Sequence, residues 1–335
     1  MSKKKTEGIA AGKVLDAAQL QVDWTAGVYK CPLCEKPLPL ESLPRLQMHP
    51  CPRCQKMIFV PEQIGGYFLY EPCGGGGMGS VYKAVSTKFP GRVLAMKVLS
   101  RQCKDKPAEI HALLNEARIS ATFQGCDFVA ASLDSGCANG EYFAVMEFIE
   151  GERLDKMIDR RKQIPEGELL KLALHILAAE QHIYRCGYLY RDIKPENIIV
   201  NPNGYAVLLD FGLCMPRAKA AGPSTEEFVS GSPYYLPPER LQGTGETAAS
   251  EIYSLGMLIY YALTGKTYYD ASEVEELAQR HLSALRINSA TKMEGVRPSL
   301  SALLDSMIRQ APKDRPQSFH EVAGAIKAIL KEIKG

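Results

Sequence analysis

Two short motifs in the second half of the chain constrain its fold more than any other feature. Residues 190–200 read YRDIKPENIIV, and residues 210–212 read DFG. Both motifs set acidic or amide side chains beside apolar residues, where such groups need a partner or a chemical task. Their meaning depends on two features that come earlier in the chain.

The first of these features is a glycine-rich segment. After a short apolar and aromatic run at Tyr67–Tyr70, the glycines Gly74, Gly76 and Gly79 form a G-x-G-x-x-G spacing. Glycines at this spacing let backbone N–H groups approach a phosphate. A dinucleotide-binding fold would continue with a helix, whereas Ser80–Val85 is β-prone. The sequence therefore predicts a strand, a tight loop and a second strand.

The second feature is a lysine inside an apolar run. Lys97 lies in the β-prone segment Arg92–Leu99, and a lysine in such a place needs an anionic partner. Glu116, in the helical-looking segment Ile110–Thr122, is the natural candidate, because a lysine–glutamate pair can hold the lysine against nucleotide phosphates. Taken alone, Glu116 could equally be a solvated helix residue.

With these features in this order, residues 64–332 resemble the eukaryotic-type (Hanks-type) protein kinases, most closely the bacterial serine/threonine branch. The resemblance rests on the loop glycines, the strand lysine, RDIKPEN, DFG and the P-P-E motif at 237–239. It implies an α+β protein-kinase fold of two lobes. A small β-rich N-lobe would span about 64–146, and a large helical C-lobe would span about 150–332.

The resemblance assigns roles to four residues of the two motifs. Asp192 would accept the proton of the substrate hydroxyl and orient the attacking oxygen, and Lys194 would neutralise the γ-phosphate during transfer. A lysine in this place resembles serine/threonine rather than tyrosine kinases. Asn197 and Asp210 would hold Mg²⁺, with Mn²⁺ as an alternative, through oxygen atoms.

The resemblance also implies how ATP is bound. Lys97, paired with Glu116, would contact the α- and β-phosphates. Adenine would lie between apolar side chains and hydrogen-bond to the backbone between the lobes, with Met146 as the back wall. Each apolar residue in this group also has a plain interpretation as a core residue. The nucleotide-binding residues implied are Gly74, Gly76, Gly79, Val81, Ala95, Lys97, Glu147 and Ile149.

Arg191 beside Asp192 resembles the mark of kinases whose activation loop is ordered by phosphorylation. Ser232 matches the family's position next to the substrate, where its hydroxyl would bond Asp192 and Lys194. In the loop at 213–238, the candidate phosphate acceptors are Ser224, Thr225 and Ser230.

Three residues depart from the family pattern. Tyr190 replaces a histidine at an apolar-stacking position, which puts little in doubt. Glu251 stands where the family has an aspartate that anchors the backbone of the catalytic loop, and a displacement near 1 Å there could cost roughly a hundredfold in rate. Ser120 occupies a usually apolar position, which would loosen the helix that carries Glu116. By contrast, Glu239 and Arg315 match the family's buried ion pair.

Four of the ten cysteines form close pairs, CPLC at 31–34 and CPRC at 51–54, with sixteen residues between them. A two-residue gap turns both sulfurs of a pair toward one ion, so this pattern predicts a tetrahedral Zn²⁺ site in a zinc-ribbon-like module. The ligands would be Cys31, Cys34, Cys51 and Cys54. Two disulfides, four free thiols or an iron site remain alternatives, and His49 is either a spare ligand or a bystander.

The chain of 335 residues, 46% apolar, has room for a large domain and one small module. We expect a flexible segment at 1–27, the zinc-ribbon-like module at 28–60 and the kinase-like domain at 64–332. No apolar signal region follows Lys3–Lys5, and the longest apolar run, Ile252–Leu263, is too short to cross a membrane. We therefore expect a cytoplasmic protein without membrane contact. The net charge of +2 gives no reason to expect nucleic acid as a partner.

These features favour an ATP-dependent serine/threonine protein kinase. Its partners would be proteins with serine or threonine acceptors and, through transient self-association, its own activation loop. Two other classes remain open. One is a pseudokinase that binds nucleotide without efficient transfer, motivated by Glu251, and the other is a scaffold protein directed by the zinc-ribbon-like module.

Overall fold

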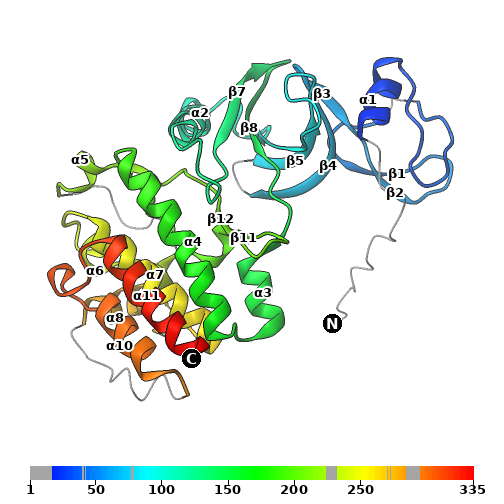
Figure 1. Ribbon diagram of the computed structural model, residues 1–335. Helices are drawn as coiled ribbons and strands as arrows, with labels where there is room; N and C mark the ends of the chain where they lie inside the picture. Colours follow the sequence, from blue (N-terminus) through cyan, green and yellow to red (C-terminus); the bar gives the residue numbers. More distant parts are fainter. Residues whose placement is uncertain are drawn as a thin grey trace. The chain divides into compact units, whose positions relative to one another are not determined.

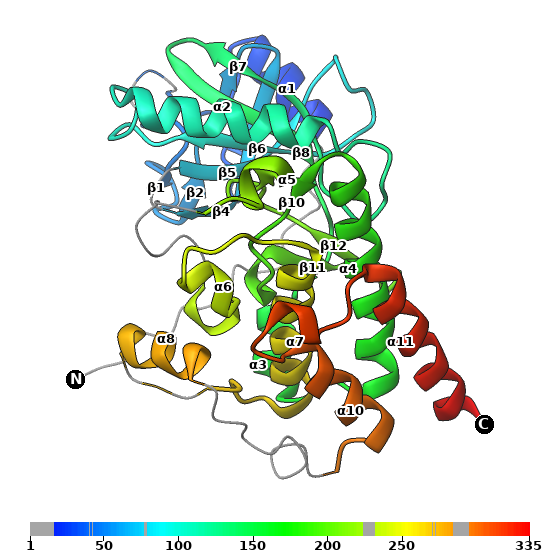
Figure 2. The same cartoon turned by 90° about the vertical axis from the view of Figure 1, so that its left-hand side faces the viewer.

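The computed structural model describes residues 17–39, 41, 43–76, 79–223, 232–269, 271, 273–283 and 295–335. The chain divides into two compact units. The first unit contains the described residues up to His111 together with Leu133–Phe148, and the second contains Ala112–Ser132 together with Ile149–Gly335. Figures 1 and 2 show their elements from two sides.

A six-stranded antiparallel sheet forms the centre of the first unit (Figure 1). Alternate side chains of each strand point to opposite faces, and one face buries Leu69, Met96, Val145 and their neighbours in a core. In spatial order the strands are β3 (Glu62–Ile64), β4 (Tyr67–Gly76), β5 (Gly79–Val85), β6 (Leu94–Leu99), β8 (Glu141–Glu147) and β7 (Ser132–Ala138).

A small module precedes this sheet within the same unit. It contains α1 (Ala17–Thr25), two cysteine-bearing loops and a short antiparallel pair, β1 (Met48–Pro50) with β2 (Met57–Phe59). Its core is small and includes two of the cysteines: Tyr29, Cys31, Leu38, Leu43, Cys51, Ile58 and Val60. Several of its large apolar side chains are exposed, including Leu33, Met48 and Met57. Such a core leaves folding dependent on additional cross-links.

Helix α1 differs from the expectation of a flexible segment up to residue 27. The indole of Trp24 lies 5.8 Å from the ring of Tyr29 and 5.7 Å from that of Phe68 on β4, measured between ring centroids. The guanidinium of Arg45 lies 4.5 Å above the same indole. These contacts give the end of the helix a packing partner that its local sequence did not reveal.

The second unit is mainly helical. Its long helices α4, α7 and α11 pack side by side, and α10 packs on α7 and α11 (Figure 2). Short strands and turns lie beside them. The helices are α3 (Leu154–Arg161), α4 (Glu166–Arg185), α5 (Arg217–Ala220), α6 (Pro238–Leu241), α7 (Ala248–Thr264), α8 (Val274–Leu282), α10 (Pro298–Met307) and α11 (Phe319–Lys334). The short strands are β9 (Glu152–Arg153), β10 (Tyr188–Leu189), β11 (Ile198–Val200), β12 (Ala206–Leu208) and β13 (Met215–Pro216). Helix α2 (Pro107–Ala121) begins in the first unit and continues into the second.

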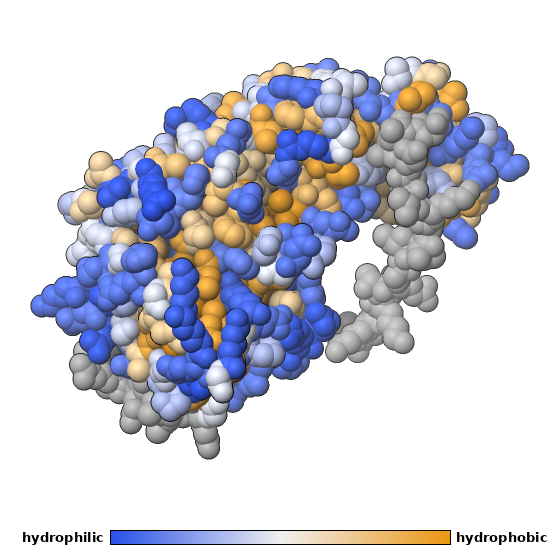
Figure 3. Space-filling model, in the orientation of Figure 1, coloured by the Kyte–Doolittle hydropathy of each residue, from blue (hydrophilic) through white to orange (hydrophobic). Residues whose placement is uncertain are grey.

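Helix α7 is the centre of the second unit. Nearly every residue from Ala248 to Leu263 is buried, which confirms that the apolar run at 252–263 is a core helix. The hydroxyl of Thr247 caps its first turn, and Gly265 ends it in the left-handed conformation (φ 70°). Around it, amphipathic helices such as α11 turn their polar sides outward, and Figure 3 shows hydrophilic residues over much of the drawn face of this unit.

The predicted ion pair between Glu239 and Arg315 is confirmed. Two guanidinium nitrogens of Arg315 donate to the Glu239 carboxylate at 2.7 and 2.9 Å, and both residues are buried. Carbonyls of Ala249, Arg309 and Gln310 accept its remaining hydrogen bonds. A buried charge satisfied in this way anchors the loop after α10 to α6, through Glu239, and to the start of α7, through Ala249.

A β-rich unit followed by a mainly helical one confirms the predicted α+β class. Among the described residues, no helix combines the length and apolar character needed to cross a membrane.

Two glycines test the helical packing. A Cβ atom on Gly256 of α7 would lie 2.8 Å from a methyl carbon of Ile308, whereas one on Gly324 of α11 would meet nothing within 4 Å. We expect Gly324→Ala to stabilise the protein by about 0.5–1 kcal/mol, because alanine favours helix. Gly256→Ala should instead destabilise it by about 1 kcal/mol, because overpacking exceeds that gain. Urea denaturation followed by circular dichroism compares the two variants, and equal stabilisation by both would contradict the close α7–α10 packing.

Candidate active site and metal centre

The YRDIKPEN motif forms a loop between β10 and β11 in the second unit. Its Asp192 is buried, and one carboxylate oxygen accepts hydrogen bonds from Lys194 Nζ and Asn197 Nδ2, both at 2.7 Å. Asn197 also donates to the main-chain carbonyl of Asp192 at 3.1 Å. The structure therefore brings together three of the residues predicted from the motif, around a single carboxylate.

The DFG motif is tied to this loop by the backbone. The N–H of Leu209 donates to the carbonyl of Asn197 at 2.8 Å. Asp210 follows with φ 56°, an uncommon conformation for a residue other than glycine, and its Oδ1 accepts the N–H of Gly212 at 3.2 Å. Asp210 and Asn197 thus both offer side-chain oxygens, the donor type that Mg²⁺ prefers.

Arg191 has the most constrained conformation in the loop, with φ 69°. Its N–H donates to both carboxylate oxygens of Glu251, at 3.0 and 3.1 Å. Its carbonyl accepts a hydrogen bond of 2.6 Å from Arg240 Nη1. Its guanidinium donates to Glu246 at 3.0 Å, and Glu246 in turn accepts Arg240 Nε at 2.7 Å. All three polar groups of Arg191 are therefore bound by charged side chains.

These contacts concern two expectations from the sequence, one about Glu251 and one about the partner of Arg191. The longer side chain of Glu251 reaches the backbone of the catalytic loop with both oxygens, so its extra methylene is accommodated. Arg191 already has an anionic partner in the buried Glu246, where we had expected a loop phosphate. The candidate acceptors Ser224, Thr225 and Ser230 lie outside the described residues.

Ser232 precedes a short turn, η3 (Pro233–Tyr235), and its carbonyl accepts the N–H of Tyr235. In the part of the chain that the structure describes, its hydroxyl makes no hydrogen bond to Asp192 or Lys194, so that contact stays a prediction. Tyr190 is buried, and its hydroxyl donates to the carbonyl of Leu209. The tyrosine thus adds a polar tie at a position expected only to stack.

Glu116 lies buried on α2, and its carboxylate is close to Gly212 of the DFG motif. Ser120, one turn later, is also buried, but its hydroxyl accepts the N–H of Ser132 at 2.7 Å. A paired hydroxyl carries a much smaller cost than an unpaired one.

The strand register of the first unit places several predicted nucleotide-binding residues on one face of the sheet. Val81 pairs with Lys97, and Ala95 pairs with Met146. Directly opposed residues share a face, as do residues two apart along a strand, so Val81, Ala95, Lys97 and Met146 lie on the same side. Gly79 is required by packing, because a Cβ there would lie 2.3 Å from the carbonyl oxygen of Val98.

The other predicted nucleotide-binding residues lie in different parts of the structure. Gly74 lies opposite Val81 in an irregular part of β4, and Gly76 ends that strand opposite Gly79. Glu147 ends β8 with its side chain exposed and paired with Arg92, so its backbone alone could serve a nucleotide. Ile149 belongs to the second unit.

The part of the cysteine module that contains Leu46 and Phe59 packs on the opposite face of the sheet from Lys97. Tyr82 lies on that face, where its ring is 5.8 Å from Phe59 and its hydroxyl donates to the carbonyl of Leu46. A cavity of about 390 Å³ between the module and the sheet is lined by Arg45, Tyr82, Val98 and their neighbours. This cavity is therefore separate from the face that carries the predicted nucleotide contacts.

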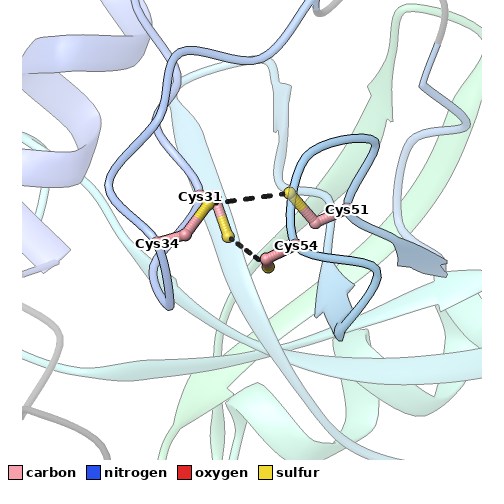
Figure 4. A group of neighbouring side chains, drawn as sticks. All are labelled: Cys31, Cys34, Cys51 and Cys54. Carbon is pink, nitrogen blue, oxygen red and sulfur yellow. Dashed lines mark hydrogen bonds between the residues drawn. The ribbon is translucent and has the colours of Figure 1, made fainter.

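The four paired cysteines converge on one point (Figure 4). Their sulfurs all lie within 4.8 Å of one another, with Cys31 and Cys54 3.8 Å apart and Cys34 and Cys51 3.9 Å apart. Four thiolates at about 2.3 Å from one tetrahedral ion would be about 3.8 Å apart. All four cysteines are free, which argues against the disulfide alternative. The cluster therefore fits a metal ion.

The two cysteine loops have the same backbone conformation. In each, an N–H donates to the first sulfur at 3.4 Å, from Leu33 to Cys31 and from Arg53 to Cys51. Glu35 and Gln55, the residues after each second cysteine, have φ 58° and 61°. His49 is half-buried, and its Nδ1 lies 2.8 Å from the carbonyl oxygen of Pro50, outside this cluster.

Comparison with known proteins gives the family. The model of the protein kinase domain matches residues 67–326. The chain belongs to the protein kinase family. Among curated kinases, a probable serine/threonine-protein kinase of Bifidobacterium longum, pknA2, is 30% identical over 82% of this chain and 36% of its own length. Pkn3 of Myxococcus xanthus is 29% identical over 77% of this chain and 49% of its own. PknK of Mycobacterium tuberculosis is 30% identical over 81% of this chain and 24% of its own. The chain thus spans less than half the length of these relatives.

Sequence reasoning did not identify Glu246 and Arg240 as part of the kinase site. Neither belongs to a recognisable motif, and their roles depend on the fold that brings them to Arg191. Glu180 on α4 was also missed, although a signal existed. It lies one turn after Leu177 on the apolar side of a helix whose spacing predicted burial, and a charge there is unusual.

Glu246 provides a test of the kinase's catalytic-loop geometry. Glu246→Ala would leave Arg191 and Arg240 without their shared anion, and we expect a loss of about 3–5 kcal/mol in the free energy of unfolding. Glu152→Ala is the matched control, because Glu152 forms a similar pair with Arg160 at the surface. That variant should lose less than about 1 kcal/mol. Equal losses in chemical denaturation would refute the buried network.

Proposed function

We propose that this protein is a serine/threonine protein kinase that transfers the γ-phosphate of ATP to serine and threonine hydroxyls of protein substrates. The observation that carries this proposal is the Asp192 carboxylate, buried and bound by Lys194 and Asn197. A carboxylate positioned in this way can accept a proton from a hydroxyl, while the lysine beside it can neutralise phosphate charge.

The transfer is a single displacement. The oxygen of the substrate hydroxyl forms a bond to the γ-phosphorus while the bond between that phosphorus and the β–γ bridging oxygen breaks, and ADP leaves. The hydroxyl proton passes to Asp192. Lys194 neutralises the negative charge of the transferring group, and the hydrogen bonds to Asp192 keep its carboxylate oriented for the proton.

In the second unit, Asn197 and Asp210 are the residues that would hold Mg²⁺. Their oxygens suit a hard cation: the amide nitrogen of Asn197 is used on Asp192, which leaves its oxygen, and Asp210 has a second oxygen beyond the one bonded to Gly212. When bound, Mg²⁺ supplies charge neutralisation for the ATP phosphates.

In the first unit, the nucleotide contacts we propose lie on the Lys97 face of the sheet. Lys97 would bind the α- and β-phosphates, with Glu116 as its partner, and the glycines would offer backbone N–H groups. Val81 and Ala95 would contact adenine, together with the backbones of Glu147 and Ile149. The shared face of Val81, Ala95 and Lys97 supports this assignment.

Lys194 and the names of the relatives support serine and threonine over tyrosine as acceptors. The partners proposed are therefore proteins with exposed serine or threonine side chains. We further propose transient self-association for phosphorylation of the activation loop, and a cytoplasmic location. A pseudokinase is not favoured by any observation, since Glu251, which had motivated it, reaches the catalytic loop.

Two substitutions test the transfer. Asp192→Asn removes the proton acceptor and should lower the rate of phosphate transfer from labelled ATP to a generic basic protein by about 10²–10⁴-fold. Asp210→Ala should lower it by a similar factor through loss of Mg²⁺. Asp159→Asn, an exposed residue of α3, is the control and should match the wild type. Equal labelling by all four proteins would reject the proposed activity.

We also propose that the cysteine cluster binds a structural Zn²⁺. A closed set of four thiolates leaves no open position for catalysis, so the ion would stabilise the module whose own core is small. Freshly purified protein should contain about one equivalent of zinc. Cys51→Ser should lose the metal and unfold at a lower temperature, whereas Cys137→Ser, at an exposed thiol, should change neither. Less than half an equivalent in the wild type would contradict the assignment.

A further inference from the structure

A buried carboxyl group behind the catalytic loop has no role in the chemistry described so far. Glu180, on α4, is 2% exposed, and neither of its carboxylate oxygens has a hydrogen-bond partner among the described residues. An ionised carboxylate cannot remain in such a place without a large cost in free energy. The charged group that acts on it is another carboxylate, Glu251 of α7.

The charges around this pair can be counted. Arg191 and Arg240 bring two positive charges, and Glu246 is bonded to both. With Glu246, Glu251 and Glu180, the group has three carboxyls for two guanidiniums. All five side chains are largely buried, so an excess negative charge would be poorly solvated. The group is neutral only when one carboxyl keeps its proton.

The hydrogen bonds indicate where that proton lies. Glu246 accepts hydrogen bonds from two guanidiniums and Glu251 accepts them from the Arg191 N–H, so both carboxyl groups have donors. Glu180 has no donor at all among the described residues. Burial and the charge of Glu251 raise the pKa of Glu180 well above its usual value, and burial raises the pKa of Glu251 to about 7. Two neighbouring carboxyls of this kind titrate as a pair.

The Cys214 thiol, after the DFG motif, has its pKa raised by burial and by Glu251, so it stays neutral. The other charged groups that act on Cys214, as Glu251 does, are the carboxylates of Asp192, Asp210 and Glu116. Helix α11 meets this end of α4 through Phe319, whose ring packs 5.7 Å from that of Tyr184. The cations that act on Glu251 are Arg240 of α6 and Arg191 of the catalytic loop.

We propose that Glu180 and Glu251 share one proton and that Glu180 is thereby a positioning residue for the catalytic loop. The shared proton satisfies the otherwise unpartnered oxygens of Glu180 and leaves one negative charge on the pair. That charge is what the Arg191 N–H binds. The sharing of the proton depends only on the folded structure. The effect of Glu180 on phosphate transfer rests in addition on the proposed kinase function.

The pair makes folding stability depend on pH. The folded pKa of Glu180 lies above its unfolded value near 4.5, so the folded state binds a proton that the unfolded state has released. The contribution of Glu180 to the free energy of unfolding is therefore fully present below about pH 4.5, and it is lost as the pH rises toward the folded pKa. Glu180→Gln keeps a neutral side chain with a donor and removes this dependence.

Thermal unfolding of the full-length protein between pH 5 and pH 7, which begins above the unfolded pKa of glutamate, tests the shared proton. We expect the melting temperature of Glu180→Gln, relative to wild type, to rise with pH over this range, by up to about 3 °C for each pH unit. Glu275→Gln, an exposed residue of α8, is the matched control and should show a constant difference. A constant difference for Glu180→Gln as well would overturn the proposal.

Hydrogen exchange tests the positioning role without reference to kinase activity. In Glu180→Leu the loop loses the shared proton while the core stays apolar, so we expect amide exchange in residues 190–197 to be at least about tenfold faster than in Glu180→Gln. Exchange in helix α8 serves as the internal control. Equal exchange in the two variants would overturn the positioning role. If the two variants differ in this way and the wild-type protein transfers no phosphate, the proposed function is refuted and the proton-sharing pair remains supported.

Discussion

The binding of Arg191 at all of its polar groups is the constraint on which the proposed catalytic site depends. The residue takes a left-handed backbone conformation, which costs on the order of 1–3 kcal/mol unless its surroundings compensate. Glu251 binds its N–H, Arg240 its carbonyl and Glu246 its guanidinium. Because Asp192 follows directly, the direction of its carboxylate is set by these contacts. The geometry of the loop thus depends on charged residues that lie outside the RDIKPEN and DFG motifs.

The same contacts explain why glutamate is tolerated at position 251. Its longer side chain reaches the loop from α7 with both oxygens, and Glu180 lies behind it. Glu251 lies near the positive charges of Arg191 and Arg240, whereas Glu180 has no donor among the described residues and therefore needs a proton. Helices α4 and α7 therefore meet through a polar contact inside an otherwise apolar core. In the proposed arrangement, Glu251 holds the catalytic loop and Glu180 shares a proton with it.

Much of the site could be predicted because its residues lie close together in the sequence. Asp192, Lys194 and Asn197 fall within one loop, and the cysteine pairs have the spacing that a metal requires, so local pattern was sufficient. The residues that hold Arg191 could not be found in this way. Glu246 lies far along the chain, and only the packing of α6 and α7 brings it to the loop. Helix α1 was missed for a similar reason, because Trp24 depends on the distant Phe68. In both cases the stabilising partner is supplied by tertiary structure.

We propose above all that the loop around Asp192 transfers phosphate to hydroxyls of serine and threonine. The most direct test is to identify the product by mass spectrometry after incubation of the full-length protein with ATP, Mg²⁺ and a generic basic protein substrate. We expect phosphoserine and phosphothreonine in the substrate, and ADP in a matching amount. Phosphotyrosine as the main product, or hydrolysis of ATP with no phosphorylated protein, would contradict this proposal.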